Sequence, residues 1–294
     1  MNAPTWIEAA LNGAWTRAKQ PHIPLGPEDI VAQALACVQE GASIIHYHAY
    51  DPQTGQQTSD VDVNVRIIEG IKSRADVIVY PAITGITAQQ ALSPEGGELR
   101  YATHRELAAR GLIEWMVVDP GSVNMSPLQD PQGAAGPQGY IYVNSEQSLQ
   151  PAYALCRQHG IRPSYAIYEP GFMRLGAALA RRYGAPTPIY RLMFSDQFSF
   201  GSPPVDAALQ AYVRLLDLQA PGAPWMVGGL GVDIAPLVAP AVAAGGHVRV
   251  GLEDAHLGCP APNSDLVRQA RAAIEQAGGT VARAADVRAA LAGR

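Results

Sequence analysis

The sequence predicts a (β/α)8 TIM barrel, an α/β fold in which parallel strands form a closed ring and helices cover its outside. Short apolar, β-prone runs alternate with longer segments of helical period along the whole chain. Eight such units can be counted, the number that barrel closure needs. The first strand-to-helix connection, residues 11–16, has no GxGxxG turn. The doubly wound open sheet, which is the alternative for such a pattern, is therefore disfavoured.

The barrel strands are expected at eight positions in chain order: Ile7–Leu11, Ser43–His48, Val77–Pro81, Trp115–Val118, Ser164–Tyr168, Tyr190–Phe194, Trp225–Gly228 and Val248–Gly251. The helices between them have recognisable ends. The clearest begins with Pro27 at a first helical position, carries Glu28 and Asp29 in its first turn, and stops before Gly41.

Two segments fall outside the repeated unit. The insertion after the fourth strand, at about 121–145, is rich in Pro, Gly and Gln and ends in the β-prone run YIYV. We expect it to pass over the barrel mouth, because loops of this length in compact domains are usually lids, binding loops or subunit contacts. The stretch at about 280–294 predicts one more amphipathic helix. No linker divides the chain, so residues 1–294 are expected to form a single domain.

Composition narrows the class of protein. The 294 residues are 48% hydrophobic and 16% charged, which supplies a large core and excludes disorder. A net charge of −5 without a Lys/Arg cluster argues against nucleic acid as a partner. Cys37, Cys156 and Cys259 form no CxxC pair and are odd in number, which favours a reducing compartment, the cytoplasm. No signal peptide or membrane-spanning run is visible, so neither secretion nor membrane insertion is expected.

Two histidines end the second predicted strand. Side chains at i and i+2 share a face, so His46 and His48 should point the same way near the carboxyl end, where barrel enzymes carry their active sites. They form half of a metal site; the alternative is a pair of barrel-filling histidines satisfied by neighbours. Glu253, just past the eighth strand, is the expected third ligand, because strands eight and two flank strand one. Two His and one carboxylate leave positions open on Zn²⁺ or Fe²⁺.

A rival site must also be weighed. His256 and Cys259 lie just downstream in AHLGC, and such a pair can bind zinc, although nothing nearby completes a tetrahedral site. The other histidines, His22, His104 and His159, have no comparable context and are expected at the surface or in loops.

The segments HYHAYDPQTG after the second strand and GGHVRVGLED at the eighth give the chain a family resemblance. It resembles the β-keto acid cleavage enzymes, which include 3-keto-5-aminohexanoate cleavage enzyme. The likeness spans almost the whole chain and includes ALNGAWT, DPGSVNM, YEPGFMR and WMVGGLG. The resemblance implies a (β/α)8 barrel with Zn²⁺ on His46, His48 and Glu253, and it implies Arg249 and Asp254 as the catalytic pair. It also implies a homo-oligomer, with a tetramer as the suggested state.

The resemblance further implies a reaction. A β-keto acid and acetyl-CoA give acetoacetate and a new acyl-CoA. The β-keto carboxylate would chelate zinc, which acidifies the carbon between its two carbonyl groups. Asp254, oriented by Arg249, would take the proton, and the enolate would attack the thioester before CoA transfer and retro-Claisen cleavage. An ion pair that closes the mouth is the structural alternative for Arg249 and Asp254.

Three departures from the family pattern affect the expected pocket. Trp15 stands where the family often has a Glu that receives a substrate amine, so a neutral or quaternary-ammonium substrate is expected over a primary amine. Ala82-Ile83-Thr84 replaces a Ser-containing stretch, and Asp119-Pro120 replaces a TT-like pair before Ser122. The expected substrate contacts are Trp15, Thr84, Asp119, Ser122 and Glu169, with rim packing as the alternative for Trp15 and Glu169.

Two other functions remain open at this stage. One is a metal-dependent aldolase or hydrolase on the same barrel. The other is a catalytically silent metal-binding barrel, which the three departures motivate. Arg249 and Asp254 discriminate between them, because a silent binder needs no base beside its metal.

Overall fold

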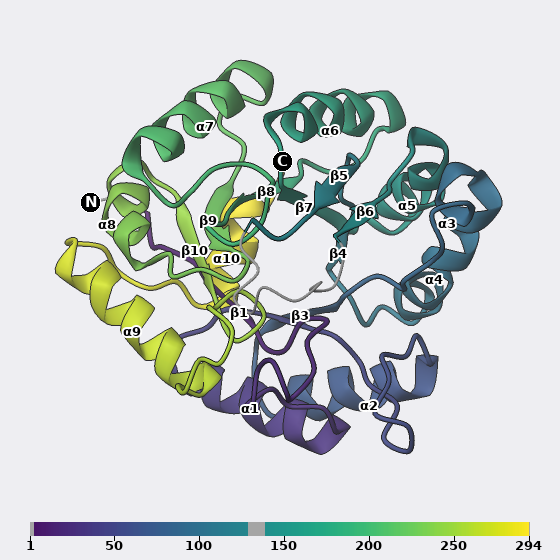
Figure 1. The fold of residues 1–294 in the computed structure, drawn as a ribbon, viewed down its shortest axis with the longest axis horizontal. Helices are drawn as coiled ribbons and strands as arrows, with labels where there is room; N and C mark the ends of the chain where they lie inside the picture. Colours follow the sequence, from purple (N-terminus) through teal and green to yellow (C-terminus); the bar gives the residue numbers. More distant parts are fainter. Residues whose placement is uncertain (1–2, 129–138, 294) are drawn as a thin grey trace.

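The computed structural model describes residues 3–128 and 139–293, which contain a nearly closed ring of eight parallel strands surrounded by helices (Figure 1). The strand order is β3-β2-β1-β10-β9-β8-β7-β4, and the two end strands contact each other. Each predicted apolar run contains one strand, so the predicted (β/α)8 barrel is confirmed. The strands are β1 Ile7–Ala10, β2 Ile44–Tyr47, β3 Ile78–Pro81, β4 Trp115–Val117, β7 Arg162–Ile167, β8 Ile189–Phe194, β9 Trp225–Gly229 and β10 His247–Val250.

Helices form the outer layer of the barrel. Helix α1 begins at Pro27 and ends before Gly41, whose φ of 117° only glycine adopts readily. None of the described helices is long and apolar enough to cross a membrane. The helices are α1 Pro27–Glu40, α2 Val61–Lys72, α3 Pro94–Arg100, α4 Ala102–Ala109, α5 Glu146–His159, α6 Pro170–Tyr183, α7 Asp206–Gln219, α8 Ala235–Ala243, α9 Asn263–Gln276 and α10 Ala284–Leu291, with a short 3₁₀ turn η1 at Gln90–Leu92.

The register around β1 brings the second and last strands of the barrel together. Ala10 on β1 is paired with His46 on β2, while Ala9 is paired with Val250 on β10. The chain then turns at Gly251, where a Cβ would lie 2.1 Å from the Ala10 carbonyl oxygen. Only glycine permits that approach, and the turn places the residues after β10 over the mouth.

A β-hairpin lies within the insertion expected at about 121–145. Strands β5 (Val123–Met125) and β6 (Tyr140–Tyr142) pair antiparallel, with Asn124 opposite Ile141. Residues 129–138 of the insertion lie outside the described part of the chain. Side chains from both strands line the cavity at the barrel mouth. The hairpin therefore forms part of the wall of that cavity.

Helix α10, which lies within the expected C-terminal helical stretch, closes the opposite end of the barrel. Its Val287 and Leu291 are buried in one cluster with Trp6 and Trp115, which stand at the amino-terminal ends of their strands. Burial of each aliphatic side chain contributes roughly 1.5–3 kcal/mol. Figure 1 shows α10 beneath the ring of strands. The barrel is therefore sealed at this end.

One histidine lies elsewhere than its sequence context indicates. His104 was expected at the surface or in a loop, but it lies in α4 with 1% of its surface exposed. The expectation was wrong, because the packing of α4 against the barrel, which local sequence does not reveal, decides its burial. Its Nε2 is 3.4 Å from the Pro81 carbonyl oxygen. Burial lowers the pKa of His104 to about 4.

We predict that His104 makes the protein less stable in acid. Between pH 6.5, its ordinary pKa, and about pH 4, the unfolded chain binds a proton at this residue that the native state does not. The free energy of unfolding should therefore fall by roughly 1.4 kcal/mol per pH unit on its account. Urea titrations over this range should show a shallower fall for His104→Asn, whereas His22→Asn, in an exposed turn, should match the wild type. Equal slopes in all three proteins would contradict the prediction.

Candidate metal centre and active site

A cavity of about 1460 Å³ opens at the carboxyl ends of the barrel strands. It exceeds the usual volume of a pocket for one small metabolite. His46, His48 and Glu253 lie in its lining, together with side chains from the hairpin and from β4 and β8. The position agrees with the general rule that parallel barrels carry their active sites at this end.

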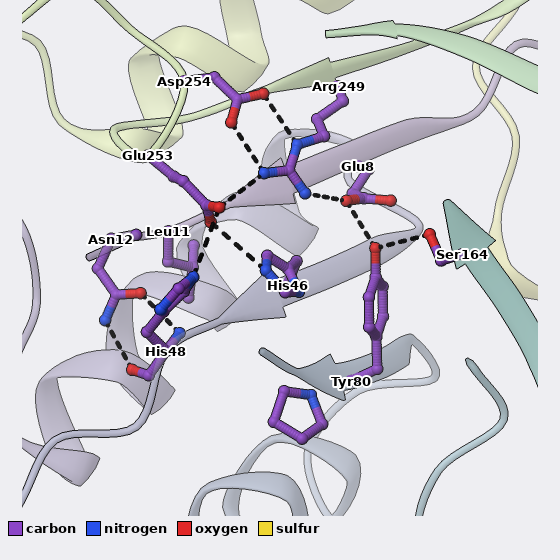
Figure 2. Close-up of polar contacts among 12 residues, drawn as sticks. Glu8, Leu11, Asn12, His46, His48, Tyr80, Ser164, Arg249, Glu253 and Asp254 are labelled. Carbon is purple, nitrogen blue, oxygen red and sulfur yellow. Dashed lines mark hydrogen bonds and ion pairs between the residues drawn. The ribbon is translucent and has the colours of Figure 1, made fainter. Parts of the chain in front are cut away.

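The three predicted metal ligands come together at the mouth (Figure 2). The Nε2 atom of His46 lies 3.5 Å from Oε2 of Glu253, and Nε2 of His48 lies 3.5 Å from Oε1. Each residue offers a ligand atom within 4.8 Å of the others. These separations suit one divalent ion bound at about 2.0–2.2 Å from each atom. Within residues 3–128 and 139–293, no other group of three His, Cys, Asp or Glu side chains forms such a cluster, and the alternative pair His256 and Cys259 is not part of one.

Surrounding groups fix the orientation of His48. Its Nδ1 is 2.9 Å from Gln57 Oε1, so the protonated Nδ1 donates to the amide and leaves Nε2 free to bind a metal. The backbone N–H of His48 donates to Asn12 Oδ1, and Asn12 Nδ2 donates back to the His48 carbonyl oxygen at 2.9 Å. Asn12 thus fastens the first loop to the end of β2.

The protonation states of this cluster suit a metal. Burial lowers the pKa of His46 well below its usual range, so the ring is neutral and has a lone pair to donate. Burial opposes ionisation of Glu253, yet the Arg249 guanidinium holds its pKa well below the usual range. Oε2 of Glu253 is buried and has no hydrogen-bond partner among the described residues. An anionic oxygen in this state is costly unless a cation binds it, so the donor set fits a divalent metal.

Arg249 on β10 connects the metal ligands to a second set of buried groups (Figure 2). Its Nε and Nη2 donate to the two carboxylate oxygens of Asp254 at 2.9 and 2.8 Å, and its Nη1 donates to Glu8 at 2.7 Å. Nη2 also lies 3.0 Å from Glu253. Glu8 in turn accepts a hydrogen bond from the Tyr80 hydroxyl at 2.8 Å. Burial raises the pKa of Asp254 to about 6, although Arg249 holds both of its oxygens.

The predicted substrate contacts divide into two groups. Trp15, Thr84 and Asp119 line the cavity. Ser122 and Glu169 lie outside the described lining: the Ser122 hydroxyl accepts from the Asn144 N–H at 2.9 Å, and Glu169 accepts from the Gly201 N–H at 3.2 Å. Neither Arg249 nor Asp254 belongs to the lining.

Sequence reasoning missed two charged groups in the barrel interior. Glu8 on β1 is fully buried against Arg249, and Arg191 on β8 lines the cavity while paired with Asp119. Both stand in otherwise apolar strands, in WIEAAL and IYRLMF. A charge within such a run was the available signal, because an ionised group is buried there only with a partner.

The fold and the site together define a barrel enzyme with a His-His-Glu candidate metal centre and an adjacent Arg–Asp pair. A family model for the β-keto acid cleavage enzyme matches residues 4–292. The chain belongs to the β-keto acid cleavage enzyme family, and the resemblance inferred from sequence motifs is confirmed.

Curated relatives support this placement, and a solved structure supports the fold. The chain is 26% identical to the 3-dehydrocarnitine:acetyl-CoA trimethylamine transferase of Rhizobium meliloti, over 98% of this chain and 96% of the relative. It is 29% identical to the 3-keto-5-aminohexanoate cleavage enzyme of Fusobacterium nucleatum, over 84% of this chain and 81% of the relative. The apo structure of ObcA superposes with a TM-score of 0.74 at 17% identity, covering 92% of this chain and 65% of that protein. A likeness at that identity establishes the fold alone.

The candidate metal site also makes a prediction for mutants. His46→Ala and His48→Ala should each abolish metal binding, because two ligands cannot hold zinc against buffer competition. Gln57→Ala, which removes only the orienting partner of His48, should retain stoichiometric metal with affinity reduced by about 10- to 100-fold. Metal content after dialysis and chelator titration measures both effects. Stoichiometric metal in the two histidine variants would refute the ligand assignment.

Proposed function

We propose that this chain is a zinc-dependent β-keto acid cleavage enzyme that converts a β-keto acid and acetyl-CoA into acetoacetate and a new acyl-CoA. The observation that carries the proposal is the position of Arg249 and Asp254 directly beside the His-His-Glu cluster. Membership of the family and the acetyl-CoA in the name of the Rhizobium meliloti relative support it.

The proposed reaction balances in atoms and charges. The carbon between the ketone and the carboxylate loses a proton and bonds to the acetyl carbonyl carbon, while the acetyl carbon–sulfur bond breaks. The released CoA thiolate then bonds to the original ketone carbon, and the carbon–carbon bond at that position breaks. The proton returns to the acetoacetate carbanion, and the other half of the keto acid leaves as acyl-CoA.

The residues at the mouth fit the parts of this reaction. A zinc ion on His46, His48 and Glu253 would supply Lewis-acid stabilisation for the negative charge that develops on the ketone oxygen. Asp254 would hold the substrate proton, and its pKa of about 6 suits a general base near neutral pH. Because Arg249 covers both oxygens of Asp254 and neither residue lines the cavity, we propose that a water carries the proton to Asp254.

The surroundings of Trp15 bear on the choice of substrate. Its indole Nε1 donates to the Glu253 carbonyl oxygen at 2.8 Å, so the ring stands next to a metal ligand. The Lys19 ammonium lies 5.9 Å from the ring centroid. This charge supports the expected preference against a primary amine, and a quaternary ammonium on the ring would meet the same repulsion. We therefore propose an uncharged or anionic group on the far side of the ketone.

Several properties stay predictions of the sequence and the family. These are zinc as the native metal, a homotetramer, and a cytoplasmic location. The aldolase or hydrolase alternative uses the same metal site without acetyl-CoA. The silent metal-binding barrel is disfavoured by Asp254, because a pure binder needs no base beside its metal.

We predict that Asp254→Asn retains fold and metal but loses turnover by about 10²- to 10⁴-fold, because an amide cannot accept the substrate proton. Arg249→Lys should also lose activity, since an ammonium cannot reproduce the planar fork on the carboxylates. Asp196→Asn is the matched control, because Asp196 lines the cavity but is exposed and has no bond to Arg249. Near-normal turnover of Asp254→Asn would show that Asp254 is not the base.

The reaction itself is tested with the zinc-loaded protein, acetyl-CoA and matched β-keto acids that end in a carboxylate, an alkyl group, a trimethylammonium or a primary amine. We expect acetoacetate and a new acyl-CoA by mass spectrometry. The kcat/KM for the keto acid with the alkyl end should be at least about tenfold above that for the keto acid with the primary amine, because this ammonium would lack a counter-ion. Omitting acetyl-CoA separates acyl transfer from the aldolase and hydrolase alternatives. An absence of turnover across anionic, neutral and cationic acids would reject the proposal. An advantage for the amine would implicate another carboxylate, such as Asp119 or Glu169.

A further inference from the structure

A buried arginine lies in the cavity lining on β8, across the ring of strands from β2. Arg191 projects from β8 with 3% of its side chain exposed, yet it belongs to the lining. Its recorded hydrogen bonds both come from Nη2, at 3.3 Å to Asp119 Oδ1 and 3.3 Å to the Ser164 carbonyl oxygen. Nε is buried with no partner among the described residues, and the side chain's hydrogen bonds to them leave Nη1 unused. Most of this guanidinium's donors are therefore unused.

The contact with Asp119 does not satisfy the hydrogen-bond donors of Arg191. The Asp119 carboxylate already accepts the Ala166 backbone N–H at 2.6 Å and the Tyr142 hydroxyl at 2.8 Å. These bonds are shorter than its contact with Arg191, so Asp119 is held mainly by β7 and the hairpin. A guanidinium that is desolvated but incompletely paired is costly, and a ligand anion would offset that cost.

Arg191 is also near the metal ligands. It donates to the Ser164 carbonyl oxygen, the Ser164 hydroxyl lies 3.3 Å from the Tyr80 hydroxyl, and the Tyr80 ring centroid is 4.8 Å from that of His46. The other buried arginine of the lining is Arg100, which donates to Asn144 and to the Val143 carbonyl oxygen. Its charge opposes the rise that burial causes in the pKa of Tyr101 and of Tyr142. Of the two, Arg191 is the one that a short molecule bound at the metal could reach.

We propose that Arg191 binds a second carboxylate, at the far end of the β-keto acid, and that the substrate is therefore a β-keto dicarboxylic acid. This rests on the proposed function, in which the ketone and first carboxylate face the metal ligands. Arg191 then acts as a specificity-determining residue. A planar guanidinium with free donors matches a carboxylate in geometry and charge. Apart from the candidate metal ligand Glu253, the described lining offers no free buried carboxylate for a cationic end, because Asp119 is already bonded and Asp196 is exposed.

The decisive measurement compares ligands that differ only at the far end. Adipate and hexanoate share a carbon chain, are inert, and differ by one carboxylate. In calorimetry with the zinc-loaded full chain, we expect adipate to bind about 10- to 100-fold more tightly than hexanoate. Arg191→Met should remove that difference and leave hexanoate binding unchanged. Arg191→Lys, which keeps the charge without the fork, should retain part of it, and Arg100→Met should retain all of it.

Each other outcome overturns the proposal. Equal weakening of both ligands by Arg191→Met would show that Arg191 binds the carboxylate beside the metal. An undiminished adipate preference would make Arg191 structural, and loss of the preference in Arg100→Met alone would move the role to Arg100. Since Arg191→Met leaves Asp119 without its cation, the double variant Arg191→Met/Asp119→Asn repeats the test with the buried pair removed. Its adipate and hexanoate affinities should be equal.

Turnover separates this inference from the proposed function. With acetyl-CoA, 3-oxoadipate should exceed 3-oxohexanoate in kcat/KM by a similar 10- to 100-fold in the wild type, and the two should be equal in Arg191→Met. If neither acid is turned over while the Arg191-dependent adipate preference persists, the acyl-transfer function fails and the anion site stands. If both are turned over equally by the wild type, the function stands and the anion site fails.

Discussion

The architecture of the site depends on one guanidinium that binds three carboxylates. Arg249 bonds Glu8 from β1 and Asp254 and Glu253 from the turn after β10, so it joins the first and last strands of the barrel at the mouth. One positive charge among three acidic groups leaves the cluster with an excess of negative charge, which a divalent ion would offset. The same contacts orient Glu253 toward the histidines. The geometry of the candidate metal site and the position of the proposed base therefore both depend on a single buried side chain.

Most of the scaffold was predictable because it depends on local patterns. Apolar runs gave all eight strands, and the i, i+2 spacing of His46 and His48 together with barrel closure placed Glu253 beside them. Glu8 and Arg191 were missed because their roles depend on which residues face them across the barrel. The register between strands that are distant in sequence decides which residues those are. The burial of the α4 histidine and the β5–β6 pairing failed to emerge for the same reason, since both arise from contacts between segments far apart in sequence.

Under both proposals, the cavity separates catalysis from substrate selection. The metal ligands and Arg249 come from β1, β2, β10 and their loops, whereas Arg191, Asp119 and the hairpin come from the other side of the ring. The names of two relatives point to different substrates, since one is a 3-dehydrocarnitine:acetyl-CoA trimethylamine transferase and the other a 3-keto-5-aminohexanoate cleavage enzyme. A barrel of this design can keep its reactive half while the opposite wall changes.

Helix α10 gives the barrel a further property. Because Val287, Leu291 and the two tryptophans fill the amino-terminal end, the cavity opens at the carboxyl ends of the strands. In the proposed reaction the keto acid binds first, at the metal ligands. The much larger acetyl-CoA then occupies the opening of the cavity. If both substrates pass through this opening, the molecule that enters last must leave first. Helix α10 at the amino-terminal end of the barrel, far from any reacting atom, would thus set the order of substrate addition and product release.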